Sequence, residues 1–344
     1  MSHRHRMFVI VAALAALAAC ASSSFARKKT DLVYLTNGDR LTGEIKQLDR
    51  GILQLKTDGL STVNIEWADI DSVNSVYHFR VEDRAGDKYF GAIFVDRDGI
   101  MEIIERGRTR SVHADSVVSM IQLDASIWQQ LDGSVSLSSS YTKAQDQTQL
   151  SFSSWIQRRT ELRKTRIDLS STISKTAGAG KTVRYDATLD HQKLLRSVLF
   201  AEVGGGAQRN DELGLDLRTS VGVGLGANMI QSNRTLLVAK TGVSVNREWA
   251  NDDTQSNNIE AILALEHAIF TYNFPKTDYS TSITFFPSLS DWGRVRVDAD
   301  IHARREIVNN FYLELTFYES YDNRPPGGGE ETDYGLTFGI SWSF

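Results

Sequence analysis

The chain ends in TDYGLTFGISWSF (residues 332–344), where apolar or aromatic side chains alternate with small or polar ones. Successive side chains of a β-strand point to opposite faces, so one face of this segment is wholly apolar. A soluble protein rarely ends on such a face. The closing strand of a transmembrane barrel does, because its outer face meets lipid and its inner face meets a polar lumen. The segment therefore predicts a β-barrel in the cell outer membrane.

Length and composition are compatible with this prediction. The chain has 344 residues, a net charge of −5 and 24 % charged residues, which is enough length for a barrel and a small domain. Nothing in this charge balance indicates a nucleic-acid partner. A helical membrane protein needs runs of about 20 apolar residues, and the sequence contains none. A barrel tolerates many charges because its lumen and loops are polar.

The first 26 residues have the pattern of a signal peptide, with a charged start followed by an apolar run over residues 7–19. Ser24-Phe25-Ala26 suits an ordinary signal peptidase, and we favour this site because a barrel needs no lipid anchor. The alternative is a lipoprotein signal ending before Cys20, which would then carry the lipid. Cys20 is the only cysteine, so no internal disulfide is expected.

A duplicated segment follows the leader. NGDRLTGEI (residues 37–45) returns as AGDKYFGAI (residues 85–93), and Gly51 returns as Gly99 at the same spacing. Self-similarity of this kind indicates two copies of one supersecondary unit, here residues 30–78 and 79–123. Each copy contains short alternating strands separated by Gly/Asp turns. The pattern resembles small SH3-like or Sm-like barrels.

Two functions are open for this N-terminal module, which we expect to face the periplasm. It either binds peptidoglycan or a periplasmic protein, or it is a folded spacer that plugs the barrel mouth. Asp39 and Asp87 are expected to stabilise their hairpin turns through side-chain hydrogen bonds to the backbone. The module lacks the basic stripe with interleaved aromatics that nucleic-acid binding requires.

Residues 132–344 repeat one theme, an alternating segment of about ten residues followed by a turn or polar loop. Tilted strands of this length cross a bilayer. Bacterial barrels have an even number of strands, and closure leaves no unpaired edge in hydrocarbon. We predict an antiparallel barrel of about twelve strands, over residues 133–142, 149–157, 163–174, 183–194, 197–208, 213–227, 235–249, 258–272, 278–286, 294–305, 310–321 and 333–344.

The alternation assigns each side chain to lipid or lumen. Val295, Val297 and Ile301 share one face of their segment, while charged residues of both signs share the other. Arg or Lys at the bilayer midplane costs about 2–4 kcal/mol, so the charged face must line the lumen. Glycines inside the middle strands indicate curvature or space inside a narrow barrel. The residues expected in an aromatic girdle are Trp249, Trp292, Tyr321, Tyr334 and Trp342.

The stretch YDNRPPGGGEE (residues 321–331), the last strand and the twelve-strand pattern together resemble an uncharacterised bacterial family of salt-induced outer membrane proteins. The resemblance covers residues 132–344. It implies an outer-membrane location and offers no catalytic residues. The ending also resembles the signal read by the outer-membrane assembly machinery, carried here by Phe338, Ile340, Trp342 and Phe344. Implied partners are therefore this machinery and outer-membrane lipid.

Two kinds of barrel enzyme have catalytic residue patterns that can be compared with this sequence. Barrel phospholipases carry His-x-Ser on one strand, and none of the lumen-region histidines is followed by such a serine. Asp298, Asp300 and His302 share one face and could activate a water, as in a barrel hydrolase of protease type. Arg296 and Arg304 flank them, which favours a salt-bridge ladder instead. No cofactor or metal site is indicated. We expect a non-enzymatic protein that serves envelope integrity or stress tolerance, or that passes a small solute slowly.

Overall fold

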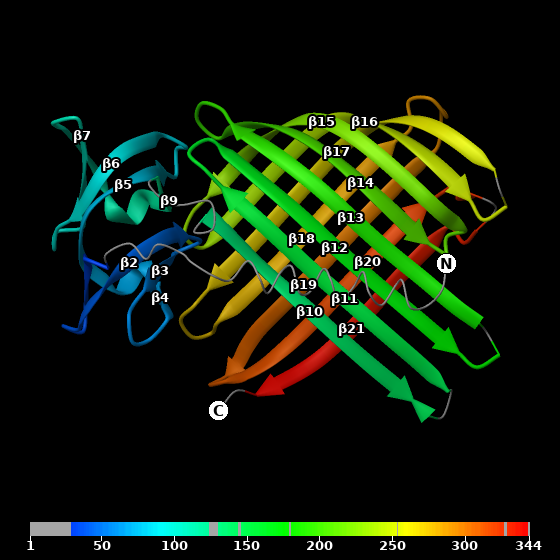
Figure 1. Ribbon diagram of the computed structural model, residues 1–344, viewed down its shortest axis with the longest axis horizontal. Helices are drawn as coiled ribbons and strands as arrows, with labels where there is room; N and C mark the ends of the chain where they lie inside the picture. Colours follow the sequence, from blue (N-terminus) through cyan, green and yellow to red (C-terminus); the bar gives the residue numbers. More distant parts are fainter. Residues whose placement is uncertain are drawn as a thin grey trace.

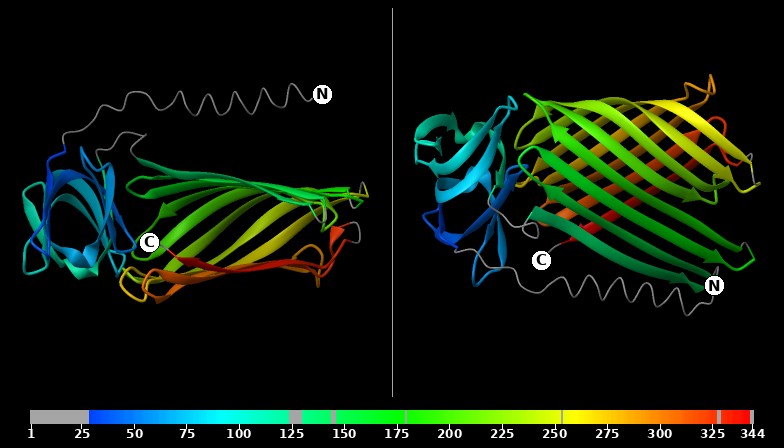
Figure 2. Two further views of the ribbon diagram at one scale, coloured as in Figure 1. Left: turned by 90° about the horizontal axis from the view of Figure 1, so that it is seen from below. Right: turned by 45° about the horizontal axis from the view of Figure 1, so that its top comes forward.

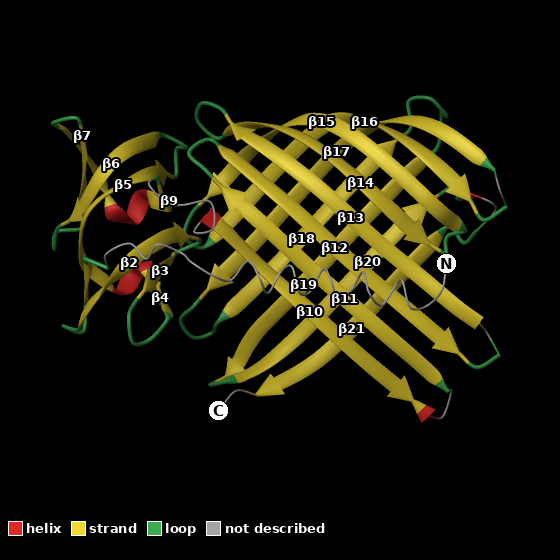
Figure 3. Ribbon diagram, in the orientation of Figure 1, coloured by secondary structure: helices red, strands yellow, loops and turns green. Residues whose placement is uncertain are grey.

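The computed structural model describes residues 29–123, 130–143, 146–178, 180–252, 254–326 and 329–342. The leader with Cys20 and the terminal Phe344 lie outside the described residues. The chain is all-β and forms two bodies that lie end to end, a small N-terminal module and a large twelve-stranded sheet (Figure 1). Strands make up nearly all of the regular structure, and the helical pieces are single turns (Figure 3).

The N-terminal module is a small barrel of nine strands around one apolar core. Two short 3-10 turns interrupt it, η1 (Trp67–Asp69) and η2 (Ala114–Ser116). The strands are β1 (Asp31–Leu35), β2 (Arg40–Asp49), β3 (Ile52–Lys56), β4 (Thr62–Glu66), β5 (Ile70–Asp83), β6 (Lys88–Val95), β7 (Ile100–Glu105), β8 (Arg108–His113) and β9 (Val117–Gln122).

The duplication in the sequence appears as internal symmetry. The first half of β5 ends one copy, and its second half begins the next. The closing strand of each copy pairs with the second strand of the other, so that Val73 lies opposite Val95 and Ile121 opposite Gln47. The core repeats at the same spacing of 48 residues, with the buried pairs Val33/Val81, Ile45/Ile93, Leu53/Met101 and Leu55/Ile103. The two copies therefore share a single core.

The two repeated turns are stabilised differently. In the first, Asn37 Oδ1 accepts from the backbone N–H of Asp39, and the Asn37 amide donates to the Asp39 carboxylate (2.8 Å). In the second, Asp83 Oδ1 accepts from the N–H groups of Ala85 and Asp87. The expectations for Asp39 and Asp87 are therefore both wrong, because the side chains that bond the turn backbone are those of Asn37 and Asp83. The first copy has an apolar leucine at the position equivalent to Asp83.

The second body is an antiparallel sheet of twelve strands in sequence order, which confirms the predicted number. All neighbours along the chain pair as hairpins. The strands are β10 (Leu131–Thr142), β11 (Gln147–Arg159), β12 (Arg163–Thr176), β13 (Gly180–Leu194), β14 (Leu199–Asn210), β15 (Leu215–Gln231), β16 (Thr235–Ala250), β17 (Gln255–Thr271), β18 (Thr277–Pro287), β19 (Val295–Val308), β20 (Phe311–Asp322) and β21 (Thr332–Trp342).

The sheet curls into a barrel-like shape with two facing walls (Figure 2). Its ladder begins at β10 and ends at β21, and these two strands form no hydrogen-bonded pair among the described residues. Residues 133–142 of β10 are exposed on both faces of the strand. The first and last strands are therefore the margins of the curled sheet.

Candidate functional site: the lumen and its two mouths

The two faces of the large sheet have opposite chemistry. Leu336, Phe338 and Ile340 point outward from β21 and are 62–65 % exposed. Val221, Val223 and Leu225 do the same on β15 and are 55–60 % exposed. Charged side chains line the concave inner face instead. An apolar band of this extent on an outer surface is rare in soluble monomers. The polar and charged groups that a functional site needs therefore lie on the inner face, in the lumen.

A buried network of arginines and carboxylates crosses the lumen at the mouth far from the N-terminal module. Glu248 of β16 is 1 % exposed and accepts from Arg218 Nε of β15 (2.7 Å) and Arg294 Nη1 (2.9 Å). Arg294, which precedes β19, also donates to Asp322 of β20 (2.5 Å). These strands belong to different parts of the curled sheet. The network therefore ties the walls together where the far mouth would open.

Two further ion pairs connect inward side chains near the far mouth. Arg296 of β19 donates twice to Glu260 of β17 (2.9 and 2.8 Å). Arg184 of β13 pairs with Asp333 of β21 (3.2 Å), and its guanidinium lies over the ring of Tyr318. Bidentate arginine–carboxylate pairs have fixed geometry. Of these two pairs Arg296–Glu260 is bidentate, and both place side chains inside the lumen.

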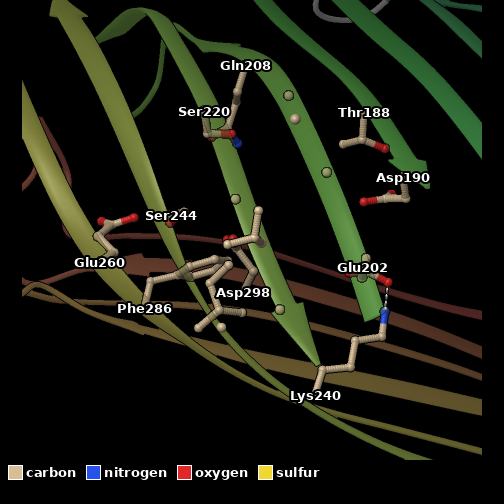
Figure 4. A pocket seen from close by; sticks show the side chains of 18 of the residues that line it. Thr188, Asp190, Glu202, Gln208, Ser220, Lys240, Ser244, Glu260, Phe286 and Asp298 are labelled. Atoms are coloured by element: carbon tan, nitrogen blue, oxygen red, sulfur yellow. Dashed lines mark ion pairs between the residues drawn. The ribbon is translucent and has the colours of Figure 1, made fainter. Parts of the chain in front are cut away.

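A cavity of about 290 Å³ lies in the lumen below this network. Its floor is glycine, because Gly204, Gly206, Gly222, Gly224 and Gly242 leave the inner face of β14, β15 and β16 without side chains. Figure 4 shows acidic and polar groups around this floor, with Phe286 and Asp298 reaching in from the facing wall. The interpretation of the glycines as lumen space is thus supported by their position.

The charges around the cavity are only partly paired. Lys240 of β16 lies between Glu202 (3.4 Å) and Glu266 (2.7 Å), as the dashed line of Figure 4 shows for Glu202. Asp190 of β13 faces the same space, and a Cβ on Gly204 would lie 2.5 Å from its Oδ1. A side chain at position 204 would therefore displace the Asp190 carboxylate from its present position in the lumen.

The module covers the near mouth. It contacts four hairpin turns of the large sheet, those between β11 and β12, β13 and β14, β15 and β16, and β17 and β18. Side chains of each body donate hydrogen bonds to backbone carbonyl groups of the other body. The docking therefore depends on the backbone conformation of the turns that carry these carbonyls. The bonds are Arg80–Glu161 (3.0 Å), Lys88–Ser197 (2.9 Å), Gln231–Asp83 (3.0 Å), Asn233–Val117 (3.0 Å) and Tyr272–Arg50 (2.6 Å).

One ion pair joins the two bodies. Asp49, at the end of β2, accepts from Arg159 at the end of β11 (2.9 Å). Burial in the junction raises the pKa of Asp49, but the Arg159 guanidinium, assisted by Arg50, lowers it more, so the net pKa lies below its ordinary value. Burial in the junction raises the pKa of Tyr272 to about 12.

The proposed hydrolase residues all lie on the inner face of β19. The carboxylate of Asp298 accepts from Ser320 Oγ (2.8 Å) and lines the glycine-floored cavity. Asp300 and His302 line a different cavity of about 310 Å³. The three residues share one face of the strand, but Asp298 lines one cavity, and Asp300 and His302 line the other. Among the described residues no group of three His, Cys, Asp or Glu side chains is arranged to hold a metal ion.

The predicted assembly-signal residues Phe338, Ile340 and Trp342 lie on the outer face of β21, each more than 60 % exposed. Trp292 and Tyr334 of the expected girdle are exposed near the far mouth, and Trp342 near the other. Within the described part of the chain, no helix is long and apolar enough to cross a membrane.

Some functional residues could not be recognised in the sequence. Arg294, Glu248 and Asp322 are far apart along the chain and carry no motif. The only signal was that inward positions contain charges of both signs. The docking residues Arg80, Asp49 and Arg159 were missed as well, because Asp49 and Arg159 end ordinary strands and Arg80 lies within one, and no motif marks them.

Residues 125–344 match the model of a family described as protein of unknown function, DUF481. No curated protein and no solved structure matches the chain. The match leaves out the N-terminal module and includes all twelve strands of the large sheet. Because it covers more than half of the 344 residues, the chain belongs to the DUF481 family.

Proposed function

We propose that this protein is a non-enzymatic β-barrel of the outer membrane whose lumen is closed at both mouths. The buried network around Glu248 and Arg294 is the observation that carries the proposal, because it occupies the far mouth with side chains that are almost fully inaccessible. The module occupies the near mouth, and in this proposal it faces the periplasm. A sealed barrel of this kind suits envelope integrity or tolerance of salt and other stress.

The outward apolar band supports the membrane location. Its side chains would face lipid, and the charged inner face would remain away from hydrocarbon, as barrel energetics require. Unpaired backbone groups at the margins of the sheet would each cost several kcal/mol in hydrocarbon. We therefore expect β10 and β21 to pair with each other once the chain is in a bilayer.

Planar-bilayer conductance tests the closed lumen. We expect the full-length protein to give no steady current. Replacing both Glu248 and Arg294 by Ala removes the side chains that join the walls and should produce a conducting species. The matched control replaces Glu314 and Arg304 by Ala, a lumen pair that is 39–40 % exposed at its side chains and lies outside the network.

Heat-modifiable gel mobility shows first that each variant is folded. A steady channel of porin size in the unmodified protein would contradict the proposal. So would an equal current from the control pair and the network pair, because the network would then not be what closes the lumen.

A further inference from the structure

A separate cavity of about 210 Å³ lies at the junction between the module and the near mouth. Its walls come from both bodies, with β2, β5 and β9 on one side and β11 to β17 on the other. Its charge is unbalanced, because six cationic side chains face three carboxylates, an excess of three. The cations are Arg50, Arg80, Arg159, Arg163, Lys164 and Lys240, and the carboxylates are Asp49, Glu82 and Glu266.

All three carboxylates are already engaged by cations. Asp49 holds Arg159, Glu266 holds Lys240, and Glu82 lies between Arg80 (3.5 Å) and Lys88 (3.6 Å). Lys164 of β12 projects into the cavity beside them and forms no ion pair among the described residues. The junction therefore has a cation with no counter-ion.

Arg80 supplies a second unsatisfied donor. Its side chain is 3 % exposed, and its terminal nitrogens donate to Glu161 O and Ser119 Oγ. Its Nε is buried and has no hydrogen-bond partner. A buried donor without a hydrogen-bond partner costs about 1–3 kcal/mol, and more when the group is charged. Burial, which outweighs the attraction of Glu82, lowers the pKa of Arg80, as expected for an under-compensated cation.

Neutral donors complete the lining. Gln231 and Asn228 reach the cavity from the end of β15, and Ser232 from the turn after it. The amides of Gln231 and Asn228 each donate one N–H within the protein, to Asp83 O and to the Gln231 side chain, and keep a second N–H, whereas the Ser232 hydroxyl already donates to Thr235 O. Oxyanions such as phosphate are bound in proteins by several charge-assisted and neutral N–H or O–H donors at once. The cavity has room for a phosphate group together with water, whose share of liquid volume is about 30 Å³ per molecule.

We propose that this junction cavity binds a small oxyanion of the phosphate class, held by Lys164 of the barrel and Arg80 of the module. The anion supplies the missing counter-charge and the acceptor for Arg80 Nε. Because its two ligands belong to different bodies, the bound anion strengthens the docking of the module on the near mouth. This site does not depend on where the barrel resides or on whether its lumen conducts.

Isothermal titration of the full-length protein in detergent with inorganic phosphate, in a chloride background, tests the site. We expect saturable binding with a Kd of about 1 mM or tighter. Lys164→Gln should weaken binding at least about tenfold, because it removes the uncommitted charge. Lys181→Gln is the control, since it removes the same charge from an exposed position at the other end of the large sheet.

Arg80→Lys is a second variant that keeps the positive charge and removes the guanidinium donors, including Nε and the terminal nitrogens bonded to Glu161 O and Ser119 Oγ, and it should weaken binding less than Lys164→Gln. Glycerol phosphate and phosphatidylglycerol nanodiscs distinguish a free anion from a lipid headgroup. The proposal is overturned if phosphate does not saturate above the chloride background, or if Lys164→Gln and Lys181→Gln bind alike. Binding to the nanodiscs alone would also overturn it, because the ligand would then be a lipid.

Discussion

At the scale of single residues, burial decides how much an ion pair on the inner face of the sheet contributes to the free energy of unfolding. Glu248 and Glu314 are both lumen carboxylates paired with arginine. Glu248 is 1 % exposed and accepts from two arginines, whereas the Glu314 side chain is 39 % exposed and pairs with one. Removing one partner of a buried pair leaves an uncompensated charge and costs about 3–5 kcal/mol. An exposed pair contributes about 0–1 kcal/mol.

Glu248→Gln is therefore expected to lower the free energy of unfolding by about 3 kcal/mol, because Arg218 and Arg294 lose their shared counter-ion. Urea titration of the detergent-folded protein, followed by the shift between folded and unfolded gel bands, measures the change. Glu314→Gln should change it by less than about 1 kcal/mol. Equal losses in the two variants would show that the far network is not energetically distinct from the rest of the lumen.

At the scale of elements, the duplicated turns provide an internal comparison. Gly51 and Gly99 occupy equivalent positions with φ of +74° and +73°, a region that L side chains rarely adopt. A Cβ on Gly51 would lie 2.9 Å from the carbonyl oxygen of Asn233 in the large sheet, while a Cβ on Gly99 would meet nothing within 4 Å. The two turns therefore differ in docking and not in backbone conformation.

Gly51→Ala should weaken the docking of the module on the large sheet. The alanine would be strained by its left-handed backbone conformation, and its Cβ would also clash with the turn at Asn233. Gly99→Ala carries the same strain, about 1–2 kcal/mol, without the clash. Hydrogen exchange in the turns at residues 232–234 and 272–276 reports docking directly. We expect faster exchange there in Gly51→Ala only. Matching exchange in both variants would mean that local strain, and not contact with the sheet, controls the module.

The elements themselves could be predicted from the sequence because the period of a strand is fixed. All twelve large strands were expected within a few residues of their observed ends, and β15 deviates most, continuing to Gln231 instead of 227. Pairings between side chains could not be predicted in this way. The period places Arg294 and Glu248 near the same mouth, but the curl of the sheet decides which walls meet. The docking of the module depends on turn shapes that the alternation does not encode.

At the scale of the whole molecule, charge is separated along the lumen. The junction cavity has three more cations than carboxylates, while the glycine-floored cavity has five carboxylates against three cations, an acidic excess of two. A lumen with a basic near end and an acidic middle differs from a uniform water-filled pore. It also explains why the module can be held by a carboxylate, since Asp49 meets the basic end.

The pH dependence of docking follows from Asp49. Its pKa in the docked molecule lies below the ordinary 3.8, because Arg159 outweighs burial, so docking favours the carboxylate. A carboxyl whose pKa is lowered by docking stabilises the docked state fully at pH values above its pKa in the undocked protein. It loses that stabilisation as the pH falls through its pKa in the docked protein. We expect Asp49 to contribute equally between about pH 5 and 8 and to release the module only in stronger acid. Burial and then Asp69 raise the pKa of Glu66, whereas Lys276 and Asn273 of the large sheet lower it, so its raised pKa does not come from the charged groups across the junction.

Energy transfer between dyes on introduced cysteines at exposed Leu60 and Lys181 measures docking across this range. Asp49→Asn removes the titrating carboxyl of the Asp49–Arg159 pair and should therefore abolish the acid release. The control is Asp98→Asn in the equivalent, undocked turn, which changes the net charge equally and should keep the acid release. If the module separates at the same pH in the unmodified protein and in Asp49→Asn, the Asp49–Arg159 pair does not hold the two bodies together.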